Sequence, residues 1–137
     1  MRYDRGSSLI ESLAALAVFA IGSACHAVWI GQSVATHARA SRLVAATTIA
    51  LSVEARMRAN REGVLAGYYE GDARDLSCAV GCDRREIAAA DLWLFHKAID
   101  RHLGAGASSR VACGPASECS ISIAWLGRPV LDWSFRP

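Results

Sequence analysis

The first part of the chain is dominated by one long apolar run. Between Ser7 and Ile30 the only charged residue is Glu11, and His26 is a second polar interruption. As a helix, residues 7–30 would extend about 36 Å, enough to cross a hydrocarbon core of about 30 Å. The two alternatives are a cleaved signal peptide and a buried core helix. A signal peptide usually has an apolar region of only about 7–15 residues, which is shorter than this run. We therefore predict a transmembrane segment over residues 7–30.

The next segment, residues 31–61, has helical periodicity without proline. Its apolar positions recur at steps of three and four and so share one helical face. They are Leu43, Ala46, Ala50, Val53 and Met57. Charged positions lie largely on other faces, namely Arg39, Arg42, Glu54, Arg56 and Arg61. The pattern predicts one helix over residues 7–61, apolar all round in its first half and amphipathic in its second. A break at Gly31 is the alternative.

A second helix is predicted over residues 83–103, after a loop over residues 63–82. Asp83 is a favourable N-cap, and Gly104-Ala105-Gly106 would end the helix. Its inner apolar stripe is Ala88, Leu92, Phe95, Ile99 and Leu103, widened by Trp93.

The C-terminal tail alternates with a period of two. Ile121, Ile123 and Trp125 form one such set, and Leu131, Trp133 and Phe135 form another. The segment 126–129 between them predicts a β-hairpin, with an earlier strand near 110–113. The apolar face of this small antiparallel sheet needs a partner, and the amphipathic half of the first helix is the natural one. The expected fold class is α+β, with a small α/β head over residues 62–137.

The chain contains five cysteines, and Cys25 lies in the apolar run without an evident partner. The other four are Cys78, Cys82, Cys113 and Cys119. They allow three disulfide pairings, of which the local pairs Cys78–Cys82 and Cys113–Cys119 are favoured over cross-pairing. Disulfides would stabilise a small head in an oxidising compartment. A zinc site is the alternative, although the spacing of the second pair is wider than usual for structural zinc.

Composition limits the function further. The chain has 137 residues, enough for one small domain, and a formal net charge of +2, too weak to indicate nucleic acid as a partner. His37, His96 and His102 do not have the spacing of a pair of metal ligands on a helix. The sequence also contains no catalytic or nucleotide-binding motif. We predict neither an enzyme nor a bound metal or cofactor. The pair Tyr68-Tyr69 is better explained by loop packing than by a binding patch.

One motif resembles a known processing signal. Gly6-Ser7-Ser8-Leu9-Ile10-Glu11, followed by the apolar run, resembles the class III signal of type IV pilins and type II secretion pseudopilins. The family usually has Phe where this chain has Ser7. Asp91, the glycine-rich stop after Leu103 and the final Ile-x-Ile-x-Trp strand are similar to PilV-type minor pilins, although these often have Trp where Phe95 stands.

The resemblance implies a sequence of processing and assembly steps. A prepilin peptidase would cut between Gly6 and Ser7, removing the leader (1–6) and leaving Ser7 as an N-methylated terminus. The single-pass chain would stay in the inner membrane, in contact with lipid, with its C-terminal head in the periplasm. Glu11 would pair with the N-terminal ammonium of a neighbouring subunit, where low dielectric strengthens the attraction and offsets part of the desolvation cost.

The function implied is that of a minor type IV pilin, which helps to initiate or cap the pilus and supports twitching motility and surface attachment. Its partners would be other minor and major pilins, the prepilin peptidase and the inner-membrane pilus assembly machinery. The nearest alternative is a minor pseudopilin of a type II secretion system. A membrane-anchored periplasmic binding domain is a further one, and it would retain residues 1–6.

Overall fold

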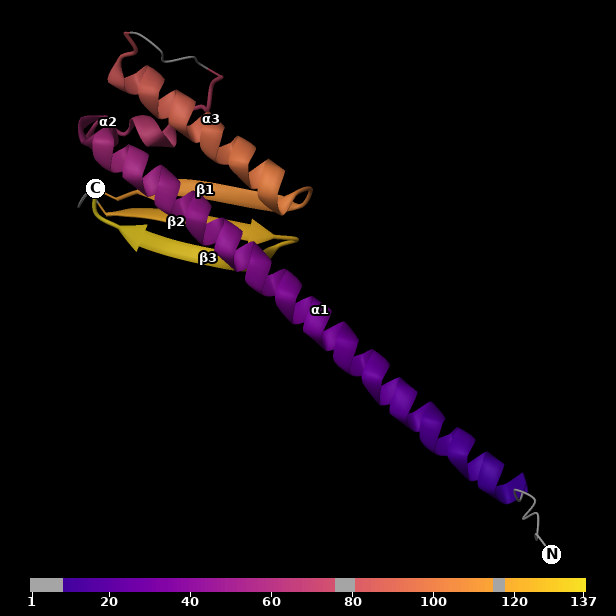
Figure 1. The fold of residues 1–137 in the computed structure, drawn as a ribbon. Helices are drawn as coiled ribbons and strands as arrows, with labels where there is room; N and C mark the ends of the chain where they lie inside the picture. Colours follow the sequence, from indigo (N-terminus) through magenta and orange to yellow (C-terminus); the bar gives the residue numbers. More distant parts are fainter. Residues whose placement is uncertain (1–8, 76–80, 115–117) are drawn as a thin grey trace, which may run out of the picture. The chain divides into compact units, whose positions relative to one another are not determined.

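A computed structural model describes residues 9–75, 81–114 and 118–137. Its elements in chain order (Figure 1) are α1 (Leu9–Ala59), α2 (Arg61–Leu65), the 3₁₀ helix η1 (Tyr68–Glu70), α3 (Arg84–Leu103), β1 (Ala107–Cys113), β2 (Cys119–Trp125) and β3 (Arg128–Phe135). A long N-terminal helix packed on a small antiparallel sheet, with further helices, confirms the predicted α+β fold class. The chain divides into two units, Met1–Arg39 and Ala40–Pro137, and we call the second the head unit.

Helix α1 runs through both halves predicted for it. It is continuous from Leu9 to Ala59, without the alternative break at Gly31. Three hydroxyls in its middle part donate hydrogen bonds to carbonyls four residues earlier: Thr36 to Gln32, Thr47 to Leu43 and Thr48 to Val44. These threonines therefore satisfy their hydroxyls locally, which makes them compatible with a helix interior.

The core of the head unit gathers one face of α1, one face of α3 and the inner face of the sheet. From α1 it takes Ala46, Ile49, Ala50, Val53 and Met57, and from α3 it takes Ala88, Leu92, Phe95, Ile99 and Leu103. From the sheet it takes Cys119, Ile121, Ile123 and Phe135. The predicted contact between the amphipathic half of α1 and the sheet is thus present. The prediction that Leu43 belongs to this apolar face is wrong. Leu43 is 47% exposed, because the buried face of α1 begins only at Ala46.

The sheet is an antiparallel meander in the order β1-β2-β3. Its register places Ile121 between Val111 and Trp133, and Ile123 between Ser109 and Leu131. Ile121 and Ile123 are buried while Ser120 is exposed, as the period-two pattern predicted. The strand expected near 110–113 is longer and begins at Ala107. Pro129 stands in β3, an edge strand, beside a register shift between Ile123 and Ala124, and edges and bulges are the places where a sheet tolerates a residue without an N–H.

The segment predicted as loop over residues 63–82 is partly helical, which corrects that prediction. Helix α2 continues almost directly from α1 through Asn60, and η1 follows after Gly67. Gly67 lies between the two short helices and has φ +74°, a left-handed conformation that glycine adopts without a Cβ penalty. Both elements are too short for sequence periodicity to reveal.

Helix α3 has the predicted start and end. The Asp83 carboxylate accepts hydrogen bonds of 2.8 Å from the backbone N–H groups of Arg85 and Glu86, and the Glu86 carboxylate accepts one from the Asp83 N–H. This reciprocal capping box satisfies N–H groups that the first helical turn leaves unpaired. Gly104, with φ +75°, ends the helix as expected.

Candidate functional site

The residues of the predicted processing signal are Gly6, Ser7 and Glu11. Gly6 and Ser7 are outside the described residues. Glu11 lies in the first turn of α1, and its side chain is exposed. A carboxylate is favoured at this end of a helix, because the first N–H groups carry a partial positive charge.

The part of α1 that follows Glu11 presents an apolar surface. Among its large side chains, Leu13, Leu16, Phe19 and Trp29 are each more than half exposed. This helix is long and apolar enough to cross a membrane. An apolar surface of this extent indicates a lipid or protein environment, because in water it would promote association. The structure is therefore compatible with the predicted single-pass anchoring.

Cys25, His26 and Trp29 lie toward the far end of the predicted span. The rings of His26 and Trp29 are 6.2 Å apart between centroids, and Cys25 has a free, exposed thiol. Tryptophan is enriched where a span meets the headgroups, so Trp29 fits the predicted end of the span near Ile30.

The head unit contains a polar cluster built on the buried Asp91 of α3. Its Oδ2 accepts a 2.8 Å hydrogen bond from the Tyr69 hydroxyl, and its Oδ1 lies 3.1 Å from Nη1 of Arg56. The Asn60 amide donates to the Arg84 carbonyl at 2.9 Å and to the Tyr69 hydroxyl at 3.4 Å. We call Arg56, Asn60, Tyr69 and Asp91 the Asp91 cluster. It joins α1, the α1–α2 junction, η1 and α3 through groups that satisfy one another.

Tyr69 is a structural group in this cluster rather than a reactive one. Burial, and secondly the hydrogen bond to the Asp91 carboxylate, raise the pKa of the Tyr69 hydroxyl well above its ordinary value. The phenol therefore stays protonated and keeps donating to Asp91 at physiological pH. This confirms the packing interpretation of Tyr69, whereas Tyr68 is half-buried with the Arg85 guanidinium 5.5 Å from its ring centroid.

A second polar contact ties α1 to the edge strand of the sheet. The Trp133 indole donates a 2.7 Å hydrogen bond to Oε2 of Glu54, and Oε1 lies 2.6 Å from Nη2 of Arg58. Glu54 is 8% exposed, which corrects the prediction that it lies on a face other than the buried one. Burial is tolerated because both carboxylate oxygens have donors. No buried side-chain nitrogen or oxygen lacks a partner in the described ranges.

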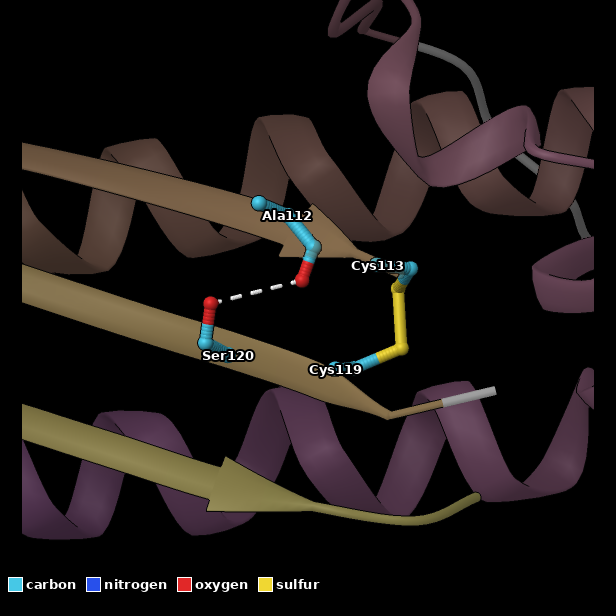
Figure 2. Close-up of a disulfide and its surroundings, with 4 residues drawn as sticks. All are labelled: Ala112, Cys113, Cys119 and Ser120. Atoms are coloured by element: carbon cyan, nitrogen blue, oxygen red, sulfur yellow. Dashed lines mark hydrogen bonds between the residues drawn. A yellow bond between two sulfur atoms is a disulfide. The ribbon is translucent and has the colours of Figure 1, made fainter. Parts of the chain in front are cut away.

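A disulfide closes the β1–β2 hairpin. Cys113 and Cys119 are bonded at the end of the two strands, where their backbones are paired (Figure 2). Beside this bond the Ser120 hydroxyl donates to the Ala112 carbonyl at 3.5 Å. The favoured local pairing of these two cysteines is thereby confirmed. Cys82 is also disulfide-bonded, and Cys78 lies outside the described residues. A cysteine in a disulfide offers no thiolate to zinc, so the zinc alternative does not apply to these three.

Sequence reasoning missed Glu54 and Asn60 as buried polar residues. Glu54 lies four residues after Ala50 and three before Met57, so the helical spacing already placed it at the edge of the buried face. Asn60 had no such signal, because its burial depends on the turn that follows α1. In the part of the chain that the structure describes, no group of three or more His, Cys, Asp or Glu side chains could hold a metal ion.

Comparison with known proteins gives no assignment. No family model, no curated protein and no solved structure matches the chain.

Proposed function

We propose that this chain is a minor type IV pilin, a structural subunit that helps to initiate or cap the pilus. The observation that carries the proposal is the segment Gly6-Ser7-Ser8-Leu9-Ile10-Glu11, whose last three residues begin the long helix α1. Cleavage after Gly6 would remove the leader and leave the helix attached to the head. Such a chain first anchors itself in the inner membrane and later enters the filament.

The two parts of α1 support different stages of this function. The first part has an exposed apolar surface, which suits lipid before assembly and the helices of other pilins afterwards. The last part contributes Ala46, Ala50 and Val53 to the core of the head unit. One helix therefore carries both the anchor and the base of the head. The disulfide at Cys113–Cys119 suits a periplasmic head, because that compartment is oxidising.

Glu11 is the residue to which we assign assembly. Transferring an unpaired carboxylate into an apolar environment costs several kcal/mol, so a partner is required wherever this helix is buried. The ammonium created at Ser7 supplies one, and a neighbouring subunit can bring it level with the acid. The pair would set the axial register between subunits, and removal of one member would leave the other buried and unpaired.

The Glu11→Ala variant tests this assignment in cells that carry the chain as their only copy. We expect its amount in the membrane fraction to be unchanged and its amount in sheared pili to fall at least tenfold. The matched control is Glu70→Ala, which removes an exposed acid from η1 and should leave both amounts unchanged. Incorporation of the Glu11→Ala variant at the wild-type level would refute the assembly role.

A minor pseudopilin of a type II secretion system is the second candidate, because it shares the processing signal and the helix that follows it. The two candidates predict different losses when the chain is deleted. A pilin deletion abolishes surface pili and twitching, whereas a pseudopilin deletion abolishes release of exported enzymes while pili remain. The second result would replace the pilin proposal.

A further inference from the structure

The turn between β2 and β3 has an unusual residue at its first position. Leu126 has φ +50° and Gly127 has φ +73°, so both central residues of this two-residue turn are left-handed. Hairpin turns of this kind strongly favour Asn, Asp or Gly, because a branched side chain is strained at positive φ. Leu126 is the only non-glycine residue with positive φ among those described. Strain of this kind, held in place by surrounding structure, is a reason to look for a function.

The surrounding structure holds the Leu126 backbone while leaving its side chain in solvent. The Leu126 N–H donates a 2.8 Å hydrogen bond to the Gly106 carbonyl. Its side chain passes over Gly106 so closely that a Cβ there would lie 2.7 Å from Cδ2. Leu126 is nevertheless 63% exposed. An apolar side chain is thus presented at the end of the head unit by a turn that other residues would form more easily.

Three arginines lie on the elements next to this turn. The Arg42 guanidinium lies 3.6 Å from the centroid of the Trp125 ring, and Arg128 pairs with Trp125 across the hairpin. Arg101 lies in the last turn of α3, which ends beside the start of β1 at the same end of the head unit (Figure 1). Of the charged residues named here three are arginines, and Asp100 is the acid that precedes Arg101 on α3. We call Arg42, Arg101, Trp125, Leu126 and Arg128 the hairpin-tip surface.

We propose that the hairpin-tip surface binds the anionic headgroup surface of a lipid bilayer. Arginines supply the charge complementarity, since each basic residue near an anionic membrane raises binding about fivefold. Trp125 has the amphipathic ring that favours the headgroup region, and Leu126 supplies an apolar side chain that can enter it. This role explains why a strained leucine stands in the turn. Asn or Gly would form the turn more easily, but neither has an apolar side chain that could enter the headgroup region.

The chain also brings this surface within reach of a membrane. Along the sequence, only residues 31–41 separate the predicted end of the span, at Ile30, from Arg42. The proposal requires that the helix be anchored in a bilayer. It does not require that the chain enter a pilus, so the two proposals can fail separately.

The test uses the full chain in lipid nanodiscs, either of phosphatidylcholine alone or with one quarter phosphatidylglycerol. A nitroxide label is attached to a single introduced cysteine in a Cys25→Ser background. The test position is Ala105→Cys, which is exposed beside the tip, and the control position is Ala66→Cys, which is exposed after α2. Collision of the label with a water-soluble nickel complex reports its exposure to solvent. We expect the label at position 105 to lose at least threefold in collision rate when the anionic lipid is present. The label at position 66 should not change.

Two variants identify the groups responsible. Leu126→Asn relieves the turn, so the head unit should melt at the same or a higher temperature, yet protection of position 105 should fall by at least half. Arg101→Gln with Arg128→Gln should abolish protection. The matched pair Arg110→Gln with Arg136→Gln removes the same charge from exposed positions elsewhere on the head unit and should leave protection intact.

Four outcomes would overturn the proposal. The label at position 105 could be equally exposed in both lipids, or equally protected in both. Its protection could survive both the Leu126→Asn and the Arg101→Gln/Arg128→Gln variants. Dipolar broadening between labels at position 105 would instead show that two copies of the chain meet at this surface.

Discussion

The Tyr69 hydroxyl donates a 2.8 Å hydrogen bond to Oδ2 of Asp91, and both residues are buried in the head unit. This contact connects η1, in the segment after α1, to the middle of α3. Because Asp91 also binds Arg56 of α1, one carboxylate fixes the two long helices and the short segment between them. The Asp91 cluster therefore sets the arrangement of the helical side of the head unit.

Removing the Tyr69 hydroxyl tests the strength of this connection. Tyr69→Phe leaves Asp91 and Asn60 without one partner each while it keeps the buried ring, so we expect the free energy of unfolding to fall by about 1–3 kcal/mol. Denaturant unfolding of the full chain in detergent micelles, followed by circular dichroism of the aromatic region, measures the loss. Tyr68→Phe is the control and should change the free energy by less than about 0.5 kcal/mol. Equal effects of the two substitutions would exclude a special role for Tyr69.

The raised pKa of Tyr69 predicts a loss of stability at alkaline pH. Above the ordinary tyrosine pKa of 10.0, the unfolded chain releases the Tyr69 proton while the folded chain retains it. The stabilisation from this group is therefore complete below about pH 10 and declines as the pH rises toward the folded pKa, by about 1.4 kcal/mol per pH unit. The difference in unfolding free energy between wild type and Tyr69→Phe isolates this contribution. A difference that stays constant from pH 9 to pH 12 would contradict the assignment.

The Cys113–Cys119 disulfide closes a loop with a sequence separation of 6. A loop of this size restricts the unfolded chain only moderately, so replacing both cysteines with serine should lower the free energy of unfolding by about 2 kcal/mol. Cys25→Ser, which removes the free thiol outside the head unit, should leave the unfolding of the head unit unchanged. A double serine variant as stable as wild type would show that strand pairing alone holds this end of the hairpin.

The periodic elements could be predicted from sequence because each has a single dominant pattern. The apolar stripe containing Ala46, Ala50 and Val53 correctly predicted the buried face of α1. The alternation around Ile121 and Ile123 correctly predicted the inner face of the sheet. Asp83 followed by Glu86 gave the start of α3. In each case local spacing and tertiary burial point the same way, which is why local reasoning succeeded.

The contacts between elements could not be predicted in this way. Glu54 is charged, and its burial depends on donors to both carboxylate oxygens, one of which is the indole of Trp133, far along the chain. Leu43 continues the spacing of the apolar stripe, yet it lies before the buried face of α1 begins. The Asp91 cluster depends on where α2 and η1 place Asn60 and Tyr69, and segments this short carry no periodicity.

We expect the chain to be processed as a prepilin, and the N-terminus of the membrane-extracted protein tests this most directly. Intact-mass and peptide mass spectrometry should find a chain that begins at Ser7, with or without N-methylation, in cells that contain a prepilin peptidase. A Gly6→Leu variant in the same cells should keep its leader. A wild-type protein whose N-terminus is Met1 or Arg2 would contradict the account.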